Sequence, residues 1–376
     1  MTSRGRGADE RDDEPTGPVE TTSPGLARLG WDDDWAAAFA ALDVPGLEPA
    51  RIAAQHRGGY TALGDVDAFL ALLPGRLLRH ARRTGERPAV GDWVGVRRLP
   101  EQGRASIEGV LPRRSKFSRR AAGESDAEQV VAANVDVVLL VLALDVELDV
   151  RGLERYLATA HESGASPVVV LTKADLVPDA ADAVTAVRQV AGDVPVHVIS
   201  NRTAVGVDAL RGYLAGDRTV ALLGASGVGK SSLVNVLLGE ERQLVGEVRA
   251  DGSGRHTTTH RALIFVPGGG LVLDTPGMRE LQLWEADEGV EATFADVEEL
   301  AEECRFPDCR HESEPGCAVQ DAIAAGELDE ERVTGYRALR AELEELAERQ
   351  EARARLEHGR AERASRHAAR TQARRS

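Results

Sequence analysis

Apolar and polar positions follow different patterns in successive parts of the chain. The first 24 residues are polar and acidic, so we expect them to be disordered, and Trp31–Leu42 then has apolar residues at helical spacing. Short strand-like stretches separated by Gly and Pro follow at Arg51–His56, Gly59–Leu63, Gly75–Arg79, Asp92–Arg98 and Ala105–Leu111. Short strands of this kind predict a small β-barrel of the OB type, although an SH3-like barrel would show the same periodicity.

Beyond a polar segment at Arg119–Ala127, which we interpret as a linker, apolar strands alternate with amphipathic helices. The expected strands are Val135–Leu144, Pro167–Leu171, Val194–Ile199, Thr219–Leu223, Leu263–Val266 and Leu271–Leu273, and the expected helices are Asp149–Ser163, Ala180–Ala191 and Ser232–Leu238. This alternation predicts a parallel α/β sheet.

Helical spacing returns near the C-terminal end. Asp329 is an N-cap candidate, and it precedes apolar residues three or four positions apart at Val333, Tyr336, Leu339, Leu343 and Leu346. We therefore expect several segments: a disordered head at 1–24, an OB-fold-like domain with an N-terminal helix at 25–118, an α/β domain at 128–293, a mostly helical domain at 294–346 and a basic tail at 347–376.

The formal net charge of −16 argues against a surface that binds nucleic acid everywhere. Basic residues are concentrated in two segments: residues 76–120 hold thirteen Arg and Lys against four acids, and residues 349–376 hold nine Arg against three acids. Each segment fits either a surface that faces phosphate or a surface of solvated charge.

The longest apolar run, Val135–Val146, contains two aspartates and is shorter than the roughly 20 residues that span a membrane. The first twenty residues lack the apolar core of a signal peptide. We expect a cytoplasmic, monomeric protein that does not bind a membrane.

The segment Gly224–Ser232 reads GASGVGKSS and matches G-x-x-x-x-G-K-[ST] between a predicted strand and a predicted helix. Such a turn directs backbone N–H groups at a phosphate, with Lys230 placed for the β- and γ-oxygens and Ser231 for Mg²⁺. The candidate phosphate site therefore comprises Gly224, Ala225, Ser226, Gly227, Val228, Gly229, Lys230, Ser231 and Ser232.

A second motif, Thr172-Lys173-Ala174-Asp175, follows another predicted strand. The Asp175 carboxylate can accept hydrogen bonds from N1–H and the exocyclic amine of guanine, a donor pair that adenine lacks. The Lys173 stem can lie over the base, and Ser200 is expected to make a second base contact. The motif predicts binding of GTP and GDP rather than adenine nucleotides.

The last predicted strand runs into Asp274–Gly277 (DTPG), where Asp274 would hold Mg²⁺ through water and the Gly277 N–H would face the γ-phosphate. One hydroxyl of the threonines at 257–259 is expected to reach Mg²⁺ when GTP is bound, and Thr258 is taken as the candidate. An ordinary GTPase has its P-loop before its base motif, whereas here Asp175 precedes Gly224. The domain is therefore predicted to be circularly permuted.

All three cysteines lie in the pattern Cys304-x₄-Cys309-x-His311-x₅-Cys317. In a reducing compartment, three thiolates and one imidazole at this spacing predict a closed tetrahedral zinc site. A closed site leaves no position for a substrate, so its expected role is structural.

Together these motifs resemble the RsgA (YjeQ) family, the circularly permuted GTPases that act in maturation of the small ribosomal subunit. The likeness covers residues 28–345 and is also carried by Val90–Val94 (VGDWV), Ala133–Asp136 (ANVD) and Gly254–Thr259 (GRHTTT). The resemblance implies an N-terminal OB domain, a permuted GTPase domain and a zinc domain, with contact to rRNA and hydrolysis stimulated by the small subunit. It also implies that His256 takes part in hydrolysis.

Two positions depart from the family pattern, which usually has Asn where Thr172 stands and often Ala where Asn201 stands. We expect the Thr172 loop to be held more loosely, with guanine specificity still resting on Asp175. The sequence leaves two other classes of protein open. One is a P-loop kinase or ATPase, which Asp175 disfavours, and the other is a zinc- and OB-type RNA-binding protein whose nucleotide acts only as a switch.

Overall fold

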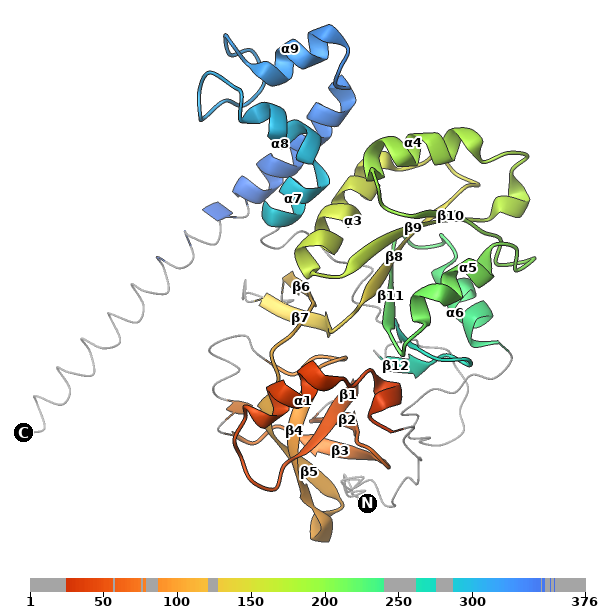
Figure 1. Cartoon of the computed structure of the whole chain (residues 1–376), viewed down its shortest axis with the longest axis vertical. Coiled ribbons are helices and arrows are strands. Elements are labelled where there is room, and N and C mark those ends of the chain that lie inside the picture. The colour runs from red at the N-terminus through yellow and green to blue at the C-terminus, as the bar shows by residue number, and fades with distance from the viewer. Residues whose placement is uncertain are drawn as a thin grey trace, which may run out of the picture.

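The computed structural model describes residues 25–56, 58–75, 77–78, 87–120, 128–239, 262–274, 287–345, 347–348, 352 and 355. Figure 1 shows three regions along the longest axis: a β-barrel, an α/β region and a helical C-terminal region. Within the described chain no helix is both long and apolar enough to cross a bilayer.

The barrel consists of β1 (Glu48–His56), β2 (Gly59–Leu63), β3 (Ala68–Leu72), β4 (Trp93–Leu99) and β5 (Arg104–Val110). Strand β1 pairs with both β2 and β4, β3 runs parallel to β5, and β4 pairs with β5, so the order β1-β2-β3-β5-β4-β1 closes on itself. This closed five-stranded barrel is of the OB type. Helix α1 (Asp33–Ala40) lies on it, with the Asp32 side chain accepting a hydrogen bond from the Trp35 N–H.

The predicted strand at Gly75–Arg79 is wrong. The described residues there, 75, 77 and 78, are helical, and the strand is β3, which lies just before Pro74. Strand β3 was missed because its sequence AFLAL is apolar throughout and Leu70 is 41% exposed, so the strand shows no alternation of apolar and polar residues.

The segment interpreted as a linker starts within one strand, and another strand begins directly after it. Strands β6 (Lys116–Arg120) and β7 (Glu128–Ala133) form a separate two-stranded antiparallel sheet, and residues 121–127 lie outside the described part. Polar residues face each other across this pair, as when Arg119 Nε donates to Oε1 of the opposite residue Gln129 at 3.2 Å. A pair without a fully apolar face gives no strand periodicity in the sequence.

The α/β region contains β8 (Val137–Ala143), β9 (Ser166–Thr172), β10 (Val196–Val198), β11 (Thr219–Leu223), β12 (Ala262–Phe265) and β13 (Leu271–Asp274), in the order β10-β9-β8-β11-β13-β12. All neighbouring pairs are parallel except β12 with β13. The predicted parallel arrangement is therefore confirmed for β8, β9, β10, β11 and β13, whereas β12 is antiparallel.

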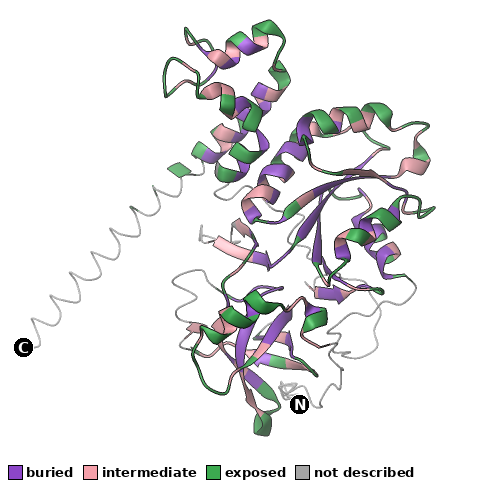
Figure 2. Cartoon of the chain, in the orientation of Figure 1, coloured by how far each residue is buried: buried purple, intermediate pink, exposed green. Residues whose placement is uncertain are grey.

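Helices cover both faces of this sheet (Figure 1). One apolar cluster joins α3 (Val150–Ser163) and α4 (Ala181–Ala191) to alternate strand residues such as Leu140, and a second joins α5 (Val207–Arg211) and α6 (Lys230–Leu238) to the residues between them, such as Leu139. The central strands are consequently buried along their whole length, as Figure 2 shows, which explains their continuous apolar sequences.

The barrel and the α/β region are joined through one continuous sheet. Barrel strand β1 pairs with β12 through Ala54 and Ala262. The buried guanidinium of Arg51 on β1 donates to the backbone oxygen of Asn134 and to the hydroxyl of Thr219, each at 2.9 Å, and Thr219 begins the strand that leads to the P-loop.

The helical C-terminal region consists of α7 (Asp287–Thr293), α8 (Ala295–Ala301), α9 (Ala318–Ala325) and a helix at residues 330–345. Asp329 is confirmed as a cap, since its Oδ1 accepts from the Glu331 N–H at 2.9 Å. The apolar face predicted for this helix is buried at Val333, Tyr336, Leu339 and Leu343, whereas position 346 lies outside the described residues. Helix α7 packs closely on α3 of the α/β region.

Candidate functional site: one sheet edge and a cysteine–histidine cluster

The candidate nucleotide residues meet at one edge of the parallel sheet. Strands β8, β9, β10, β11 and β13 all run in the same direction, so the loops after them project from the same edge. In parallel α/β sheets this carboxyl edge is where ligands bind. The base motif follows β9, Ser200 follows β10, the P-loop follows β11 and Asp274 ends β13.

The P-loop turn depends on glycine at defined points. Gly224 has φ 147°, and a Cβ there would lie 2.2 Å from the Val141 backbone oxygen, so no other residue fits. Helix α6 begins at Lys230, two residues before the predicted start, and its first turn includes a bond from the Leu233 N–H to the Gly229 oxygen at 2.9 Å. The Lys230 ammonium donates to the backbone oxygens of Gly224 and Ala225, inside the loop that it belongs to.

The base motif is fixed by its own short-range contacts. Lys173 has a left-handed backbone conformation, with φ 62°, and its ammonium donates to both carboxylate oxygens of Asp145 at 2.9 Å. Asp145 lies in the loop after β8. The Ala174 N–H donates to the Ile199 oxygen at 3.1 Å, which ties this loop to the end of β10.

Asp175 and Ser200 are brought together as the motifs predicted. The buried Ser200 hydroxyl donates to Asp175 Oδ1 at 2.5 Å, and Arg202 Nε donates to Oδ2 at 2.7 Å. The hydrogen bond from Ser200, followed by that from Arg202, lowers the pKa of Asp175 below its ordinary value. The carboxylate is therefore ionised and held in one orientation. Motif analysis missed Asp145 and Arg202, because neither belongs to a recognised pattern.

Two side chains connect the base loops to the P-loop. The Thr172 hydroxyl lies 2.6 Å from the Val228 oxygen and 3.0 Å from the Leu142 oxygen, and the Asn201 side-chain N–H₂ donates to the Gly229 oxygen at 3.0 Å. Thr172 is fully buried. The Thr172 hydroxyl and the Asn201 amide both reach the P-loop backbone, and the expectation that Thr172 holds this loop more loosely than Asn would stays a prediction.

Asp274 is the last residue of β13, beside β11 in the sheet, and so lies at the edge from which the P-loop projects. The other predicted members of the site, His256, Thr258 and Gly277, lie outside the described residues.

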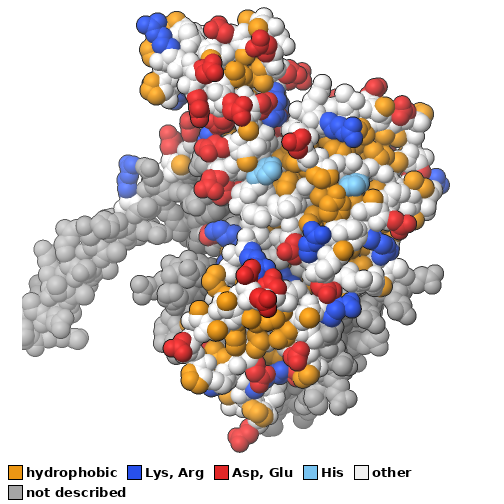
Figure 3. Space-filling model, in the orientation of Figure 1, with side chains coloured by type: hydrophobic (Ala, Val, Ile, Leu, Met, Phe, Trp, Pro, Cys, Tyr) orange, Lys and Arg blue, Asp and Glu red, His pale blue; other side chains and the backbone are white. Residues whose placement is uncertain are grey.

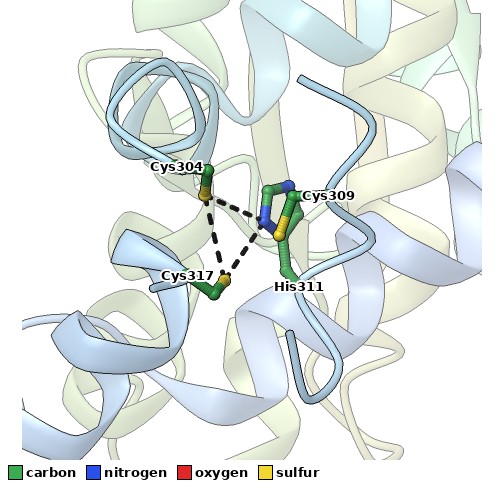
Figure 4. Close-up of side chains that lie close together, drawn as sticks. All are labelled: Cys304, Cys309, His311 and Cys317. Carbon is green, nitrogen blue, oxygen red and sulfur yellow. Dashed lines mark hydrogen bonds between the residues drawn. The ribbon is translucent and has the colours of Figure 1, made fainter. Parts of the chain in front are cut away.

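The predicted zinc ligands come together in the C-terminal region (Figure 4). The ligand atoms of Cys304, Cys309, His311 and Cys317 all lie within 4.8 Å of one another. The two sulfurs of Cys304 and Cys317 are 3.8 Å apart, and they lie 3.6 and 3.5 Å from His311 Nδ1. Tetrahedral bonds of about 2.3 Å to sulfur and about 2.0 Å to nitrogen would set separations of about 3.8 and 3.5 Å. The residues therefore fit a tetrahedral metal ion.

The surroundings of the Cys309 thiol favour its neutral form. Burial, together with the neighbouring Cys317 and Cys304, raises the pKa of the Cys309 thiol to about 12. A bound dication reverses this, because it stabilises the thiolates that coordinate it. Cys317 is also the N-cap of α9, where its sulfur accepts from the Gln320 N–H at 3.5 Å.

The fold and this edge define a P-loop protein of the α/β class, with its base motif before its P-loop. The model of the RsgA GTPase family matches residues 110–284. The small ribosomal subunit biogenesis GTPase RsgA of Opitutus terrae is 49% identical over 327 residues, which cover 84% of this chain and 89% of that protein. The protein of the same name from Streptomyces coelicolor is 46% identical over 340 residues, which cover 88% of this chain and 90% of that protein.

Solved structures agree with this comparison. YjeQ from Thermotoga maritima is 28% identical with a TM-score of 0.58, over 79% of this chain and 98% of that one. YloQ, described as a circularly permuted GTPase, is 25% identical with a TM-score of 0.57, over 80% and 96%. The chain belongs to the RsgA GTPase family, and it is a circularly permuted GTPase.

Proposed function

We propose that this protein hydrolyses GTP during late maturation of the small ribosomal subunit, that it binds the rRNA of that subunit, and that the subunit stimulates hydrolysis. The observation that carries the proposal is the meeting of the P-loop and the Asp175 loop at one sheet edge, in a chain of the RsgA GTPase family. The relatives from O. terrae and S. coelicolor are named for small-subunit biogenesis, and we extend that role to this chain.

In this proposal the base is read by residues 172–175 and by Ser200. The two oxygens of Asp175 accept from guanine N1–H and its exocyclic amine, and the Lys173 stem covers one face of the ring. The pair between Lys173 and Asp145 places that stem, and the bond from Ser200 orients the carboxylate. The Lys173 stem and the Asp175 carboxylate are thus held in place before the base binds.

The phosphates are bound by the P-loop, residues 224–232. The backbone N–H groups at the start of α6 face the phosphates, and the Lys230 ammonium moves from the Gly224 and Ala225 oxygens to the β- and γ-phosphate oxygens. Mg²⁺ comes with GTP in this family; Ser231, Asp274 and Thr258 are its proposed protein contacts, and the Gly277 N–H is the proposed contact of the γ-phosphate. When bound there, Mg²⁺ would supply positive charge beside the transferred phosphoryl group.

We further propose that His256 positions the attacking water. The residue after the DTPG sequence is Met278, which cannot usefully hydrogen-bond a water, so the group must come from elsewhere. A neutral imidazole can orient a water without first removing its proton. In His256→Ala, the kcat stimulated by small subunits should fall by about a hundredfold or more, with GTP affinity and subunit binding little changed. If small subunits stimulate this variant fully, the group that positions the water must come from the subunit.

The Cys₃His cluster is proposed to hold one structural zinc ion. Its four protein ligands complete the coordination, so this site takes no part in hydrolysis. The ion would tie the loop between α8 and α9 to the base of α9 and thereby order the C-terminal region.

Contact with rRNA is proposed for the basic segment at 76–120, in a cytoplasmic, monomeric protein. On the face in Figure 3, basic side chains gather along the boundary between the barrel and the α/β region. Two arginines of this segment already have structural partners: Arg113 donates to the buried Asp92 at 2.7 and 2.8 Å, and Arg114 donates to Asp32 at 2.6 and 2.7 Å. The proposed phosphate contact is therefore assigned to the basic segment as a whole, and a change at either of these two arginines would also break its ion pair.

The function is tested by assaying phosphate release from GTP and ATP with purified small subunits, large subunits or neither. We expect slow hydrolysis of GTP alone, strong stimulation by small subunits only, and no turnover of ATP. Equal stimulation by both subunits, or preference for ATP, would contradict the proposal.

A further inference from the structure

Two side chains, each from a different loop of the base site, contact the backbone at the end of the P-loop. The Thr172 hydroxyl reaches the Val228 oxygen, and the Asn201 amide reaches the Gly229 oxygen; these are the two residues immediately before Lys230. Gly229 has φ 100°, and a Cβ on it would lie 2.9 Å from Asn201 Nδ2 and 3.6 Å from Thr172 Oγ1. Both side chains are thus packed against the P-loop as well as hydrogen-bonded near it.

Each of these two side chains is next to a residue that reads the base. Thr172 precedes Lys173, and Asn201 follows Ser200, whose hydroxyl holds Asp175. A shift of the 200–202 loop relative to Gly229 would therefore displace the oxygens of Asp175 relative to the phosphate loop. These two bonds link the loops of the base contacts to the loop of the phosphate contacts.

We infer that Asn201 is a positioning residue for guanine specificity, which acts by locking the 200–202 loop to the P-loop. This inference rests on the proposed binding of guanine nucleotides at this edge. Preorganised contacts lose less entropy when a ligand binds, and a bidentate base contact needs both acceptors in register with the bound phosphates. Asn201 should therefore affect the preference for guanine, although it is not assigned a contact with the base.

The contacts of Asn201 separate this role from a role in folding. Among the described residues, Asn201 Oδ1 is buried without a hydrogen-bond partner. Asn201→Ala removes one hydrogen bond but also removes this unpaired acceptor, so the two effects on stability oppose each other. The thermal midpoint should change little. Asn201→Asp instead places a carboxylate oxygen opposite the Gly229 oxygen, where two acceptors repel.

The test measures GDP and ADP affinities and the GDP dissociation rate for the full chain, for both Asn201 variants and for Thr203→Ala. Thr203 is an exposed control in the same loop, where only its backbone N–H contacts Ser200. We expect Asn201→Ala to weaken GDP binding about tenfold through faster dissociation and to lower the GDP-to-ADP preference by a similar factor. Asn201→Asp should lose more GDP affinity and more of this preference, and Thr203→Ala should match the parent in both.

An unchanged GDP-to-ADP preference in Asn201→Ala would overturn the inference, even if the affinities for both nucleotides fell, because a general loss of structure lowers both together. If the parent protein itself shows no preference for GDP, the proposed function fails and the inference fails with it. A parent that prefers GDP, with variants that keep the same preference, refutes the role of Asn201 alone.

Discussion

Replacing Asp175 by Asn changes one acceptor of the proposed guanine site into a donor. The structure indicates how the amide would be oriented. Arg202 Nε–H donates to Asp175 Oδ2, so an amide nitrogen placed there would oppose a second donor. On the other side is the Ser200 hydroxyl, which can rotate to accept. The amide nitrogen should therefore face Ser200, and the local fold should survive the change.

The expected loss follows from counting bonds at the base. Guanine offers two donors to two carboxylate oxygens, whereas the amide offers one acceptor and sets its N–H₂ against the other donor. Losing one charge-assisted hydrogen bond and creating a donor–donor contact should weaken GTP binding by about thirtyfold or more. Xanthine has an oxygen in place of the exocyclic amine, so the same amide can donate to it. Affinity for xanthosine triphosphate should rise.

The assay is an equilibrium titration of both nucleotides against the parent, Asp175→Asn and Asp208→Asn. Asp208 on α5 is fully exposed, and its carboxylate lies 3.7 Å from Arg211, so its change removes the same charge away from the site. We expect the control to keep the GTP preference of the parent. If Asp175→Asn binds GTP as tightly as the parent does, Asp175 does not read the base, and the assignment of guanine must rest on other residues.

The other predictions concern the zinc cluster and the contact between the C-terminal region and α3. Elemental analysis should find one zinc per chain, and protein without stoichiometric zinc would contradict this prediction. Cys309→Ala should destabilise the C-terminal region while nucleotide binding remains, because structural zinc contributes ~10 kcal/mol or more to the folding free energy of small domains. Gly289→Ala should lower the free energy of unfolding by about 1–3 kcal/mol, because its Cβ would lie 2.1 Å from the Ala158 backbone oxygen on α3. At the control position Gly212, an added Cβ meets no atom of the described part of the chain within 4 Å, so Gly212→Ala should not be destabilised in denaturant titrations. Burial raises the pKa of Glu154 from 4.5 to about 7 despite Arg332, so the folded state binds a proton that the unfolded state lacks. Its stabilising effect is full below pH 4.5 and is lost as the pH rises through 7. Glu154→Gln should therefore reduce the difference in unfolding free energy between pH 6 and 8, and an unchanged difference would show that Glu154 does not titrate there.

The sequence by itself determined the local elements and the chemistry of the motifs. The P-loop, the base motif and the Cys₃His pattern are short stretches in which backbone turn, donor and acceptor are specified within a few residues. The α/β strands were readable because helices bury both faces, which leaves continuous apolar runs. Strand β3 and the β6–β7 pair gave no such signal, because their partners and their exposure depend on the rest of the fold.

Only the tertiary structure decided the contacts between distant residues. The bonds from Thr172 to Val228, from Asn201 to Gly229 and from Arg202 to Asp175 join loops that are separated along the chain. The pairing of Ala54 with Ala262, which makes the barrel sheet continuous with the α/β sheet, is equally non-local. Periodicity and motif spacing report on neighbours along the chain, whereas these bonds depend on how strands are ordered in space. For this reason the sequence predicted which nucleotide is bound, but the structure was needed to show what holds the base and phosphate loops in register.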